Sequence, residues 1–315
     1  MTKTLLNLKG TLEDVRNYSI KLVKKDWSDL GSDMDYLMAN PMDPMALLPV
    51  ATGSSYGAKL DDLIHVASIV SLAGTALRIF DDCADKDSTN ALYLSTGIGR
   101  AIHVATGLSM IATRSILQMP IPIDRRNNFI DDYFHAFLQV CKGQDRDIDC
   151  IASTLSEYQQ VVREKTIAAY EFAAIAGTYM ATSDSYAMTC SKECGAHLGW
   201  IQQILDDMEA FWFPDGSNDV SDKEYNTFPV LYGLSLNDPH VANLQLLCSS
   251  NERDSDQIRA ILDKMDVRRK LMTLALNHRD HAISILESAP HPGCHEILRH
   301  LLDWQFRDGD RLLGN

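Results

Sequence analysis

Apolar residues recur at three- and four-residue spacing along most of the chain, which is the period of a helix with one buried face. Few stretches show the two-residue alternation of a strand. Segments rich in Pro and Gly separate the helical stretches, at residues 41–49, 119–122, 214–218 and 289–293. The predicted helices cover residues 60–80, 96–117, 129–141, 154–180, 187–213 and 256–287. The pattern predicts an all-α protein.

Two of the predicted helices, residues 64–80 and 167–180, are apolar on most sides and carry few charges. Such helices belong in the centre of a bundle rather than on its surface. None of the gaps between helices is long or polar enough for a flexible linker. We therefore expect a single domain, residues 1–315, built as a bundle of many helices.

Composition narrows the class of protein. The chain has 315 residues, 45% of them apolar, which is enough for a large core. No uninterrupted apolar stretch approaches the ~18 residues of a membrane span, and the first ten residues lack the pattern of a secretory signal. Seven cysteines without CxxC spacing indicate neither a disulfide framework nor a structural zinc site. We expect a cytoplasmic protein with no integral membrane segment.

The formal net charge is −14 at pH 7, and no basic stripe interrupts it. This charge repels nucleic acid and anionic lipid, so no nucleic-acid partner is expected. An anionic substrate would need metal ions or a focused basic pocket.

The first candidate site is an acidic cluster that ends an apolar helix. Four-residue spacing puts Asp81 and Asp85 on one face, with Asp82 beside them. Mg²⁺ relieves the repulsion among carboxylates, because it prefers oxygen ligands and is usually held by one or two carboxylates together with substrate phosphates. This DDxxD pattern is a weak signal alone, since a solvated helix end explains it equally well.

A second acidic cluster lies about 120 residues on. Asp206 and Asp207 share one side of an otherwise apolar helix with Trp200 and Gln203. Two such clusters in one bundle are able to face each other across a central cavity, with metal and diphosphate between them.

Lys165 lies between the clusters and precedes a largely apolar stretch. Its ammonium group is expected to border the cavity and to meet a diphosphate as a point charge. The alternative is a lysine that extends from a buried stem to solvent.

The order of these segments resembles the trans-polyprenyl diphosphate synthase family of class I isoprenoid synthases, from about Ile64 to Leu234. The resemblance implies an all-α bundle around a deep central apolar cavity, a cluster of several Mg²⁺ ions, an allylic prenyl diphosphate substrate and a homodimer. The matching segments are His65 to Asp85, Gly143-Gln144, Glu157-Tyr158, Lys165-Thr166, Gly195 to Asp207, and Thr227-Phe228-Pro229-Val230.

The resemblance also implies roles for individual residues. Lys165 corresponds to a diphosphate contact, and Thr166 and Gln203 to groups whose oxygens face the developing carbocation. Bulky residues shorten the prenyl tunnel in relatives, so small residues such as Gly74 and Ala76 favour a C15 or C20 substrate. The substrate-binding positions are Lys165, Gln203, Ala76, Leu77 and Phe80. The metal ligands are Asp81, Asp82, Asp85 and Asp206, with Asp207 as a weaker candidate.

The chain also departs from the family. The family holds isopentenyl diphosphate with a basic motif near the N-terminus, but residues 40–57 contain no Lys or Arg. The Arg pair that follows DDxxD is missing, Ala210 replaces a third aspartate of the second motif with Glu209 beside it, and Lys223 is the only basic residue of 214–225. The chain is thus a divergent member that keeps the groups for ionising an allylic diphosphate and lacks those for holding a second diphosphate.

We therefore expect a Mg²⁺-dependent enzyme that ionises an allylic prenyl diphosphate. It would act either as a terpene synthase, which cyclises the cation, or as a prenyltransferase to an acceptor other than isopentenyl diphosphate, and the sequence does not separate these two. An ordinary chain-elongating synthase and a non-catalytic partner subunit of a synthase remain alternatives. A di-iron bundle would need ExxH pairs near the acidic clusters, and these are absent from the sequence.

Overall fold

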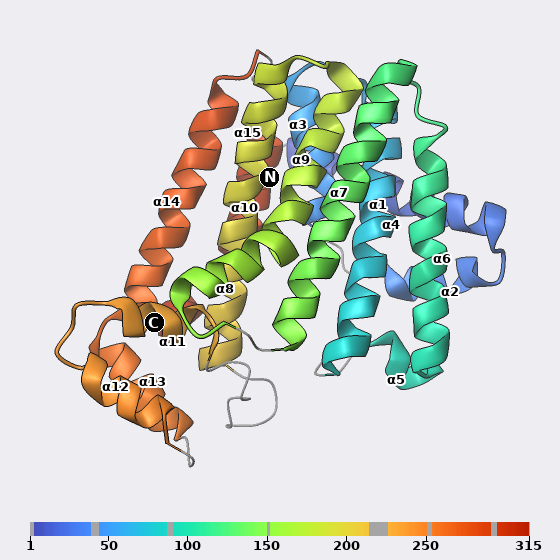
Figure 1. Cartoon of the computed structure of the whole chain (residues 1–315). Helices are drawn as coiled ribbons and strands as arrows, with labels where there is room; N and C mark the ends of the chain where they lie inside the picture. Colours follow the sequence, from blue (N-terminus) through green and yellow to red (C-terminus); the bar gives the residue numbers. More distant parts are fainter. Residues whose placement is uncertain are drawn as a thin grey trace. The chain divides into compact units, whose positions relative to one another are not determined.

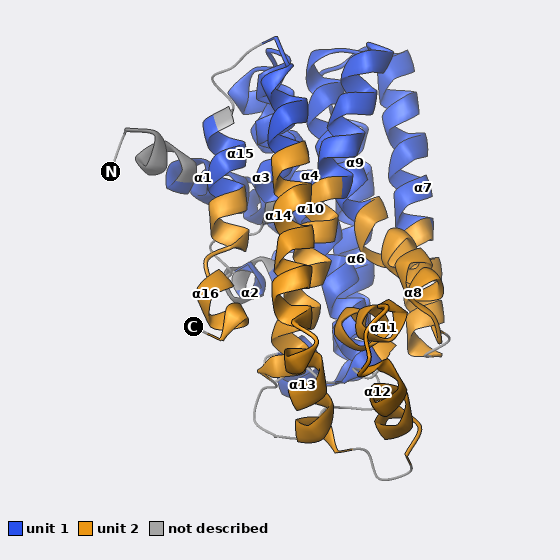
Figure 2. Cartoon of the chain, turned by 90° about the vertical axis from the view of Figure 1, so that its left-hand side faces the viewer, with its two compact units in different colours: residues 1–138, 169–196, 282–301 blue, residues 139–168, 197–281, 302–315 orange. Residues whose placement is uncertain are grey.

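The computed structural model describes residues 3–38, 44–86, 91–149, 152–213, 226–250, 254–290 and 295–314. Within these ranges the regular structure is helical and contains no strand, which confirms the all-α prediction (Figure 1). The chain divides into two compact units. Unit 1 comprises Met1–Leu138, Ala169–Ala196 and Ala282–Leu301, and unit 2 comprises Gln139–Ala168, His197–His281 and Leu302–Asn315 (Figure 2). The single-domain expectation stays a prediction, because two compact units can belong to one folding domain.

Some helices lie wholly within one unit, and others contribute residues to both. Unit 1 holds α1 (Lys3–Asp26), α2 (Leu30–Leu37), α3 (Pro44–Ser55), α4 (Leu60–Asp85), α5 (Leu92–Thr96) and α6 (Ile98–Ile116). Unit 2 holds α8 (Leu155–Val162), the π-helical turn η1 (Arg163–Ile167), α11 (Phe228–Ser235), α12 (Val241–Cys248), α13 (Ser255–Lys264) and α16 (Gly309–Leu313). Both units receive residues from α7 (Ile123–Ile148), α9 (Ala168–Ala181), α10 (Ser185–Trp212), α14 (Val267–Glu287) and α15 (His295–Gln305).

Helix α4 is the centre of unit 1 and packs against α1, α3 and α6. Its buried residues fall on every side of the helix, as its apolar sequence predicts. It is long and apolar enough to cross a membrane, but 72% of its most apolar stretch is buried inside the protein. Core helices pass the same test of length and hydropathy, so α4 is explained as a core helix.

The predicted gap at residues 41–49 is wrong in its second half, because α3 begins at Pro44 and contains Pro49. Close packing compensates for the missing N–H of this proline. The Thr52 hydroxyl donates to the Ala174 carbonyl (2.6 Å), and a Cβ on Gly177 would lie 1.9 Å from the Pro49 carbonyl oxygen. Tertiary contacts thus stabilise a helix that local propensity argues against.

Two predicted helices are interrupted. The stretch 154–180 contains the π-helical turn η1 between α8 and α9. The stretch 256–287 divides at Asp266, whose φ of 58° is left-handed, so that α13 and α14 are separate helices. Aspartate tolerates this conformation better than most residues. Neither interruption carries the Gly or Pro that marks a helix end in sequence.

Candidate active site

The first acidic cluster occupies the C-terminal turn of α4. Asp81, Asp82 and Asp85 are each half-buried, and the helix ends where Lys86 turns left-handed (φ 59°) and its N–H bonds to the Asp82 carbonyl. The last turn contains no basic residue. Three carboxylates therefore lie at the end of a helix whose dipole is negative, an arrangement that a bound cation would relieve.

The positions predicted to contact the prenyl chain lie on the same helix within unit 1. Ala76 is fully buried, whereas Leu77 and Phe80 are half-buried. A Cβ on Gly74 would meet only the Met45 sulfur, at 3.5 Å, so the space beside this glycine is small but not closed. A role for these residues in substrate binding stays a prediction.

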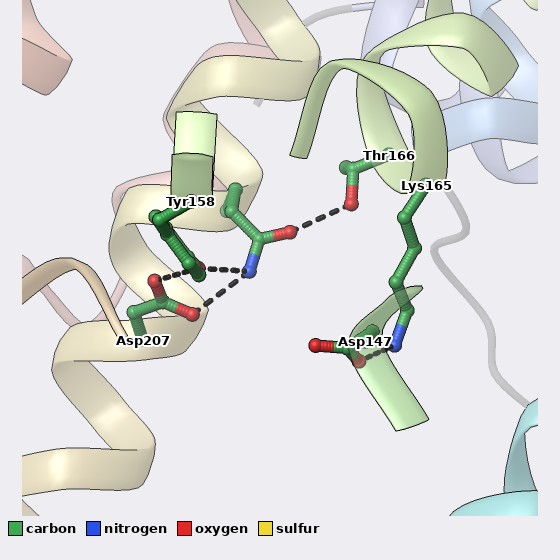
Figure 3. Close-up of polar contacts among 6 residues, drawn as sticks. Asp147, Tyr158, Lys165, Thr166 and Asp207 are labelled. Carbon is green, nitrogen blue, oxygen red and sulfur yellow. Dashed lines mark hydrogen bonds and ion pairs between the residues drawn. The ribbon is translucent and has the colours of Figure 1, made fainter. Parts of the chain in front are cut away.

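Lys165 and Thr166 lie in the π-helical turn η1. Such turns are rare and occur frequently at functional sites, because one extra residue redirects the neighbouring side chains. The Lys165 ammonium lies 2.8 Å from the Asp147 carboxylate of α7, and the two side chains are 25% and 19% exposed (Figure 3). Lys165 is therefore held at a partly buried position and does not extend freely into solvent.

Packing between α7 and η1 fixes the backbone of Lys165. A Cβ on Gly143 would lie 2.3 Å from the backbone nitrogen of Lys165, so only glycine permits this approach. Beside it, the buried Glu164 carboxylate pairs with Lys142 (2.7 Å) and Arg146 (3.3 Å). Burial alone would raise the Glu164 pKa, but these basic groups and a hydrogen bond from Gln160 lower it overall.

Gln203 is at the centre of a hydrogen-bond network within unit 2. Figure 3 labels three of its partners, Tyr158, Thr166 and Asp207. Its carbonyl oxygen accepts from the Thr166 hydroxyl (2.6 Å). Its amide nitrogen donates to the Asp207 carboxylate (2.8 Å) and to the Tyr158 hydroxyl (3.1 Å). Tyr158 in turn donates to Asp207, and so does the backbone N–H of Phe228 (3.1 Å). The structure thus joins Thr166 to Gln203, two residues predicted to act together.

Burial controls the protonation of this network. Tyr158 is 5% exposed, and burial together with the Asp207 charge raises its pKa well above 10, so that it remains a donor. Burial raises the Asp207 pKa to about 7, against the opposing effect of hydrogen bonds from Tyr158, Gln203 and Phe228.

Asp206 differs from its neighbour. Its side chain is exposed, and Gln202 donates a hydrogen bond to it (2.7 Å). The surrounding protein raises its pKa to about 6, chiefly by desolvation.

Other residues near the second motif have partners of their own. Glu209, which follows Asp206 by three residues, pairs with Arg311 of α16. Trp200 is buried and packs against Phe228 and His278, at ring-centroid distances of 6.4 and 6.1 Å. Core packing therefore accounts for Trp200. The predicted departures at residues 87–90 and 214–225 lie outside the described residues.

In the part of the chain that the structure describes, no three His, Cys, Asp or Glu side chains are preassembled to hold a metal ion. Asp81, Asp82 and Asp85 in unit 1, and Asp206 in unit 2, carry carboxylate oxygens on residues that are at least partly exposed. Carboxylate donors of this kind fit Mg²⁺, which keeps several waters and completes its coordination with phosphate oxygens.

Tyr158, Asp147 and the Phe228 N–H are polar partners that sequence reasoning did not assign. Two lie in segments with a visible signal, since Glu157-Tyr158 and Thr227-Phe228 both belong to the family resemblance. Glu157 completes a capping box with Thr154 at the start of α8, which directs the next residue, Tyr158, to the buried face. Asp147 carried no signal beyond its place among the charges of 142–147.

Comparisons with known proteins find relatives of this chain in sequence and in fold. The chain is 27% identical over 184 residues to the tryptophan prenyltransferase ComQ of Bacillus subtilis subsp. natto (strain BEST195), a match that covers 58% of this chain and 54% of that protein. The matched part is thus about half the length of that relative.

Solved structures share the fold. Geranylgeranyl pyrophosphate synthetase of Pyrococcus horikoshii Ot3 superposes with a TM-score of 0.82 at 18% identity, over 95% of this chain and 97% of that one. Polyprenyl synthase of Caulobacter crescentus CB15, complexed with calcium and isoprenyl diphosphate, gives 0.77 at 19% identity, over 94% of each chain. The bundle therefore has the isoprenoid synthase fold. The sequence model of the polyprenyl synthetase family matches residues 42–265, well over half of the chain, and the chain belongs to that family.

Proposed function

We propose that the protein is a prenyltransferase that moves the prenyl group of an allylic diphosphate to an acceptor other than isopentenyl diphosphate. The observation that carries this proposal is a contrast. Lys165, Thr166 and Gln203 are positioned by specific contacts. In contrast, α3 lies in the segment where the family carries its basic motif for a second diphosphate. That helix has no basic residue, and Leu47, Leu48 and Val50 are 2% exposed or less.

The chemistry follows from these residues. The bond between the allylic carbon and the diphosphate oxygen breaks, and its electron pair leaves with the diphosphate. Lys165 binds the departing diphosphate as a point charge. Asp81, Asp82, Asp85 and Asp206 would hold Mg²⁺, which would supply further neutralising charge.

The cation that remains on the prenyl carbon needs a polar but unreactive environment. The oxygen dipoles of Thr166 and Gln203 face this charge, and they are already oriented, so little reorganisation is required. Electrons of the acceptor then form the new bond to carbon, and the acceptor loses a proton.

For the acceptor we propose an indole, as in tryptophan, and for the donor a C15 or C20 diphosphate. The matched relative that is named a tryptophan prenyltransferase supports the indole. An indole is uncharged and electron-rich, so it needs no basic motif to hold it. This agrees with the absence of Lys and Arg from residues 40–57.

A homodimer remains part of the proposal. Helices α6 and α7 are neighbours, joined within unit 1 by a hydrogen bond between Thr113 and Tyr133 (3.4 Å). Both expose large apolar side chains, which is typical of an interface with another chain. In α6 and α7 they are Ile98, Ile102, Met110, Ile123, Phe134 and Leu138, and Leu117 directly follows α6. Light scattering of the purified protein should give about twice the chain mass of 35.2 kDa.

The test is a product assay with geranyl, farnesyl and geranylgeranyl diphosphate and Mg²⁺, each with and without tryptophan or a short tryptophan peptide. We expect a prenylated indole, identified by mass spectrometry, together with one diphosphate released for each product. A cyclic hydrocarbon formed without any acceptor would indicate a terpene synthase instead. Products that lengthen only with isopentenyl diphosphate would indicate a chain-elongating synthase and contradict the proposal.

A further inference from the structure

We infer that Asp207 is a positioning residue that fixes the orientation of the Gln203 amide and is not a metal ligand. This inference rests on the proposed function, since it concerns how the same site is divided between metal binding and orientation of the cation-facing groups.

The hydrogen bonds of Asp207 are the first argument. Its Oδ1 accepts from the Gln203 amide, and its Oδ2 accepts from both the Tyr158 hydroxyl and the Phe228 N–H. A carboxylate offers about four lone-pair sites, and three of these are already engaged. The residue is also only 6% exposed, so a metal ion would have to displace protein donors to reach it.

The orientation of Gln203 is the second argument. An amide side chain can place its oxygen on either side, and its partners decide which. Here the nitrogen faces two acceptors, the Asp207 carboxylate and the Tyr158 hydroxyl oxygen. The carbonyl oxygen must then face Thr166. Without Asp207, the amide could turn by half a rotation and present N–H groups to a developing cation.

The chain segments that meet at Asp207 are the third argument. Tyr158 comes from α8, Gln203 and Asp207 from α10, and Phe228 is the first residue of α11. The first N–H groups of a helix lack partners within it, and the positive end of the helix dipole favours a carboxylate there. One side chain therefore links three family segments, Glu157-Tyr158, the second acidic motif and Thr227-Phe228.

Asp206 gives the contrast. It is the adjacent residue, yet its side chain is exposed and accepts a hydrogen bond from Gln202 on the same helix. An exposed carboxylate can exchange water for a metal ion at little cost. The two aspartates thus divide the work, with one facing solvent and one facing the protein.

The experiment compares Asp207→Asn, Tyr158→Phe and their double variant with Asp206→Asn as the matched control. Metal binding is measured by calorimetry. Mn²⁺ is titrated into the protein in the presence of an unreactive thiolodiphosphate analogue of the allylic substrate. Turnover is read as diphosphate released from farnesyl diphosphate, and folding by circular dichroism. Tyr158→Phe keeps the carboxylate, so it stays informative if Asp207→Asn folds poorly.

We expect Asp207→Asn to lower kcat by about 10- to 100-fold, the usual effect of misplacing a group near the reacting atoms. Mn²⁺ affinity should stay within about twofold of the wild type. Tyr158→Phe should act in the same direction, and the double variant should be no worse than Asp207→Asn, because both changes remove one network. Asp206→Asn should weaken Mn²⁺ binding at least about tenfold.

Loss of Mn²⁺ affinity in Asp207→Asn equal to that in Asp206→Asn would overturn the inference, as would fully additive effects of the two network changes. Binding is measured without turnover, so these outcomes are separate from failure of the proposed reaction. A wild-type protein that binds neither Mn²⁺ nor the analogue would overturn the proposed function, and this inference with it.

Discussion

The two acidic motifs of this chain use the same residue type in opposite surroundings. Asp81, Asp82 and Asp85 are half-buried at the C-terminal end of α4, where the helix dipole and their mutual repulsion disfavour them. Asp207 is buried and accepts hydrogen bonds from three donors of its own unit. Burial and partners, rather than residue type, therefore decide which carboxylates are available to a ligand and which stabilise the protein.

The substitution with the largest expected effect is Asp85→Asn, which tests the role of the first motif. The first motif should matter to catalysis and hardly to stability. We expect kcat/KM for diphosphate release to fall by about three orders of magnitude, because a proposed ligand of Mg²⁺ is lost. The melting temperature should stay the same or rise slightly, since one negative charge leaves the C-terminal end of α4. A large fall in melting temperature with activity retained would reverse the assignment.

Lys165→Met tests the charge that faces the diphosphate in the proposed reaction. Hydrogen bonds to charged groups contribute roughly 1.5–3 kcal/mol, so binding of the allylic diphosphate should weaken about 10- to 100-fold. Asp147→Asn is the matched control, because it removes the partner of Lys165 and keeps the ammonium. Equal losses in both variants would mean that the ion pair is structural and that Lys165 makes no separate contact with substrate.

Gly143→Ala tests the packing beside Lys165, because it displaces the backbone of that residue without changing any charge. The added Cβ would lie 2.3 Å from the backbone nitrogen of Lys165, so η1 must shift. We expect a loss of about 1–3 kcal/mol in the free energy of unfolding, with reduced turnover. Gly10→Ala is the control, since nothing lies within 4 Å of its added Cβ in the middle of α1. That change should stabilise the protein by about 0.5–1 kcal/mol. Equal effects of the two changes would argue against close packing at Gly143.

The smallest expected effect concerns His278, which is half-buried and stacks on Trp200. Burial, with the neighbouring His197 and His281, lowers its pKa from 6.5 to about 4. Between these values the unfolded chain binds the extra proton, so stability is lost as pH falls from about 6.5 towards 4. Compared with His278→Gln, the wild type should lose about 1–2 kcal/mol more between pH 7 and pH 4.5 in chemical denaturation. Parallel pH curves for the two proteins would contradict the shift.

Much of the fold could be predicted from the sequence, because helical periodicity is a local signal. The apolar helix ending at DDxxD appears as α4, Leu60–Asp85, and residues 187–213 appear as α10, Ser185–Trp212. The helical part of 41–49 and the break at Asp266 could not be predicted. The first depends on packing of Pro49 against Gly177, and the second on a left-handed residue that is not glycine.

The site divides in the same way. The resemblance to the family suggested Lys165, Thr166 and Gln203, and the structure joins the last two by a hydrogen bond. The partners of these residues depend on long-range contacts, such as Tyr158 with Asp207, and periodicity carries no information on those. The π-helical turn at Arg163–Ile167 was likewise invisible, since its sequence reads as ordinary helix. The metal ligands and the prenyl-binding positions remain predictions.

The most direct test of the central claim is an assay with farnesyl diphosphate, Mg²⁺, tryptophan and isotopically labelled isopentenyl diphosphate. A family synthase with its basic motif would build the label into a longer diphosphate. We predict that diphosphate is released, that an unlabelled prenylated indole forms, and that no labelled chain appears. Efficient formation of a labelled C20 diphosphate would contradict the account, because the protein would then bind isopentenyl diphosphate without the basic motif.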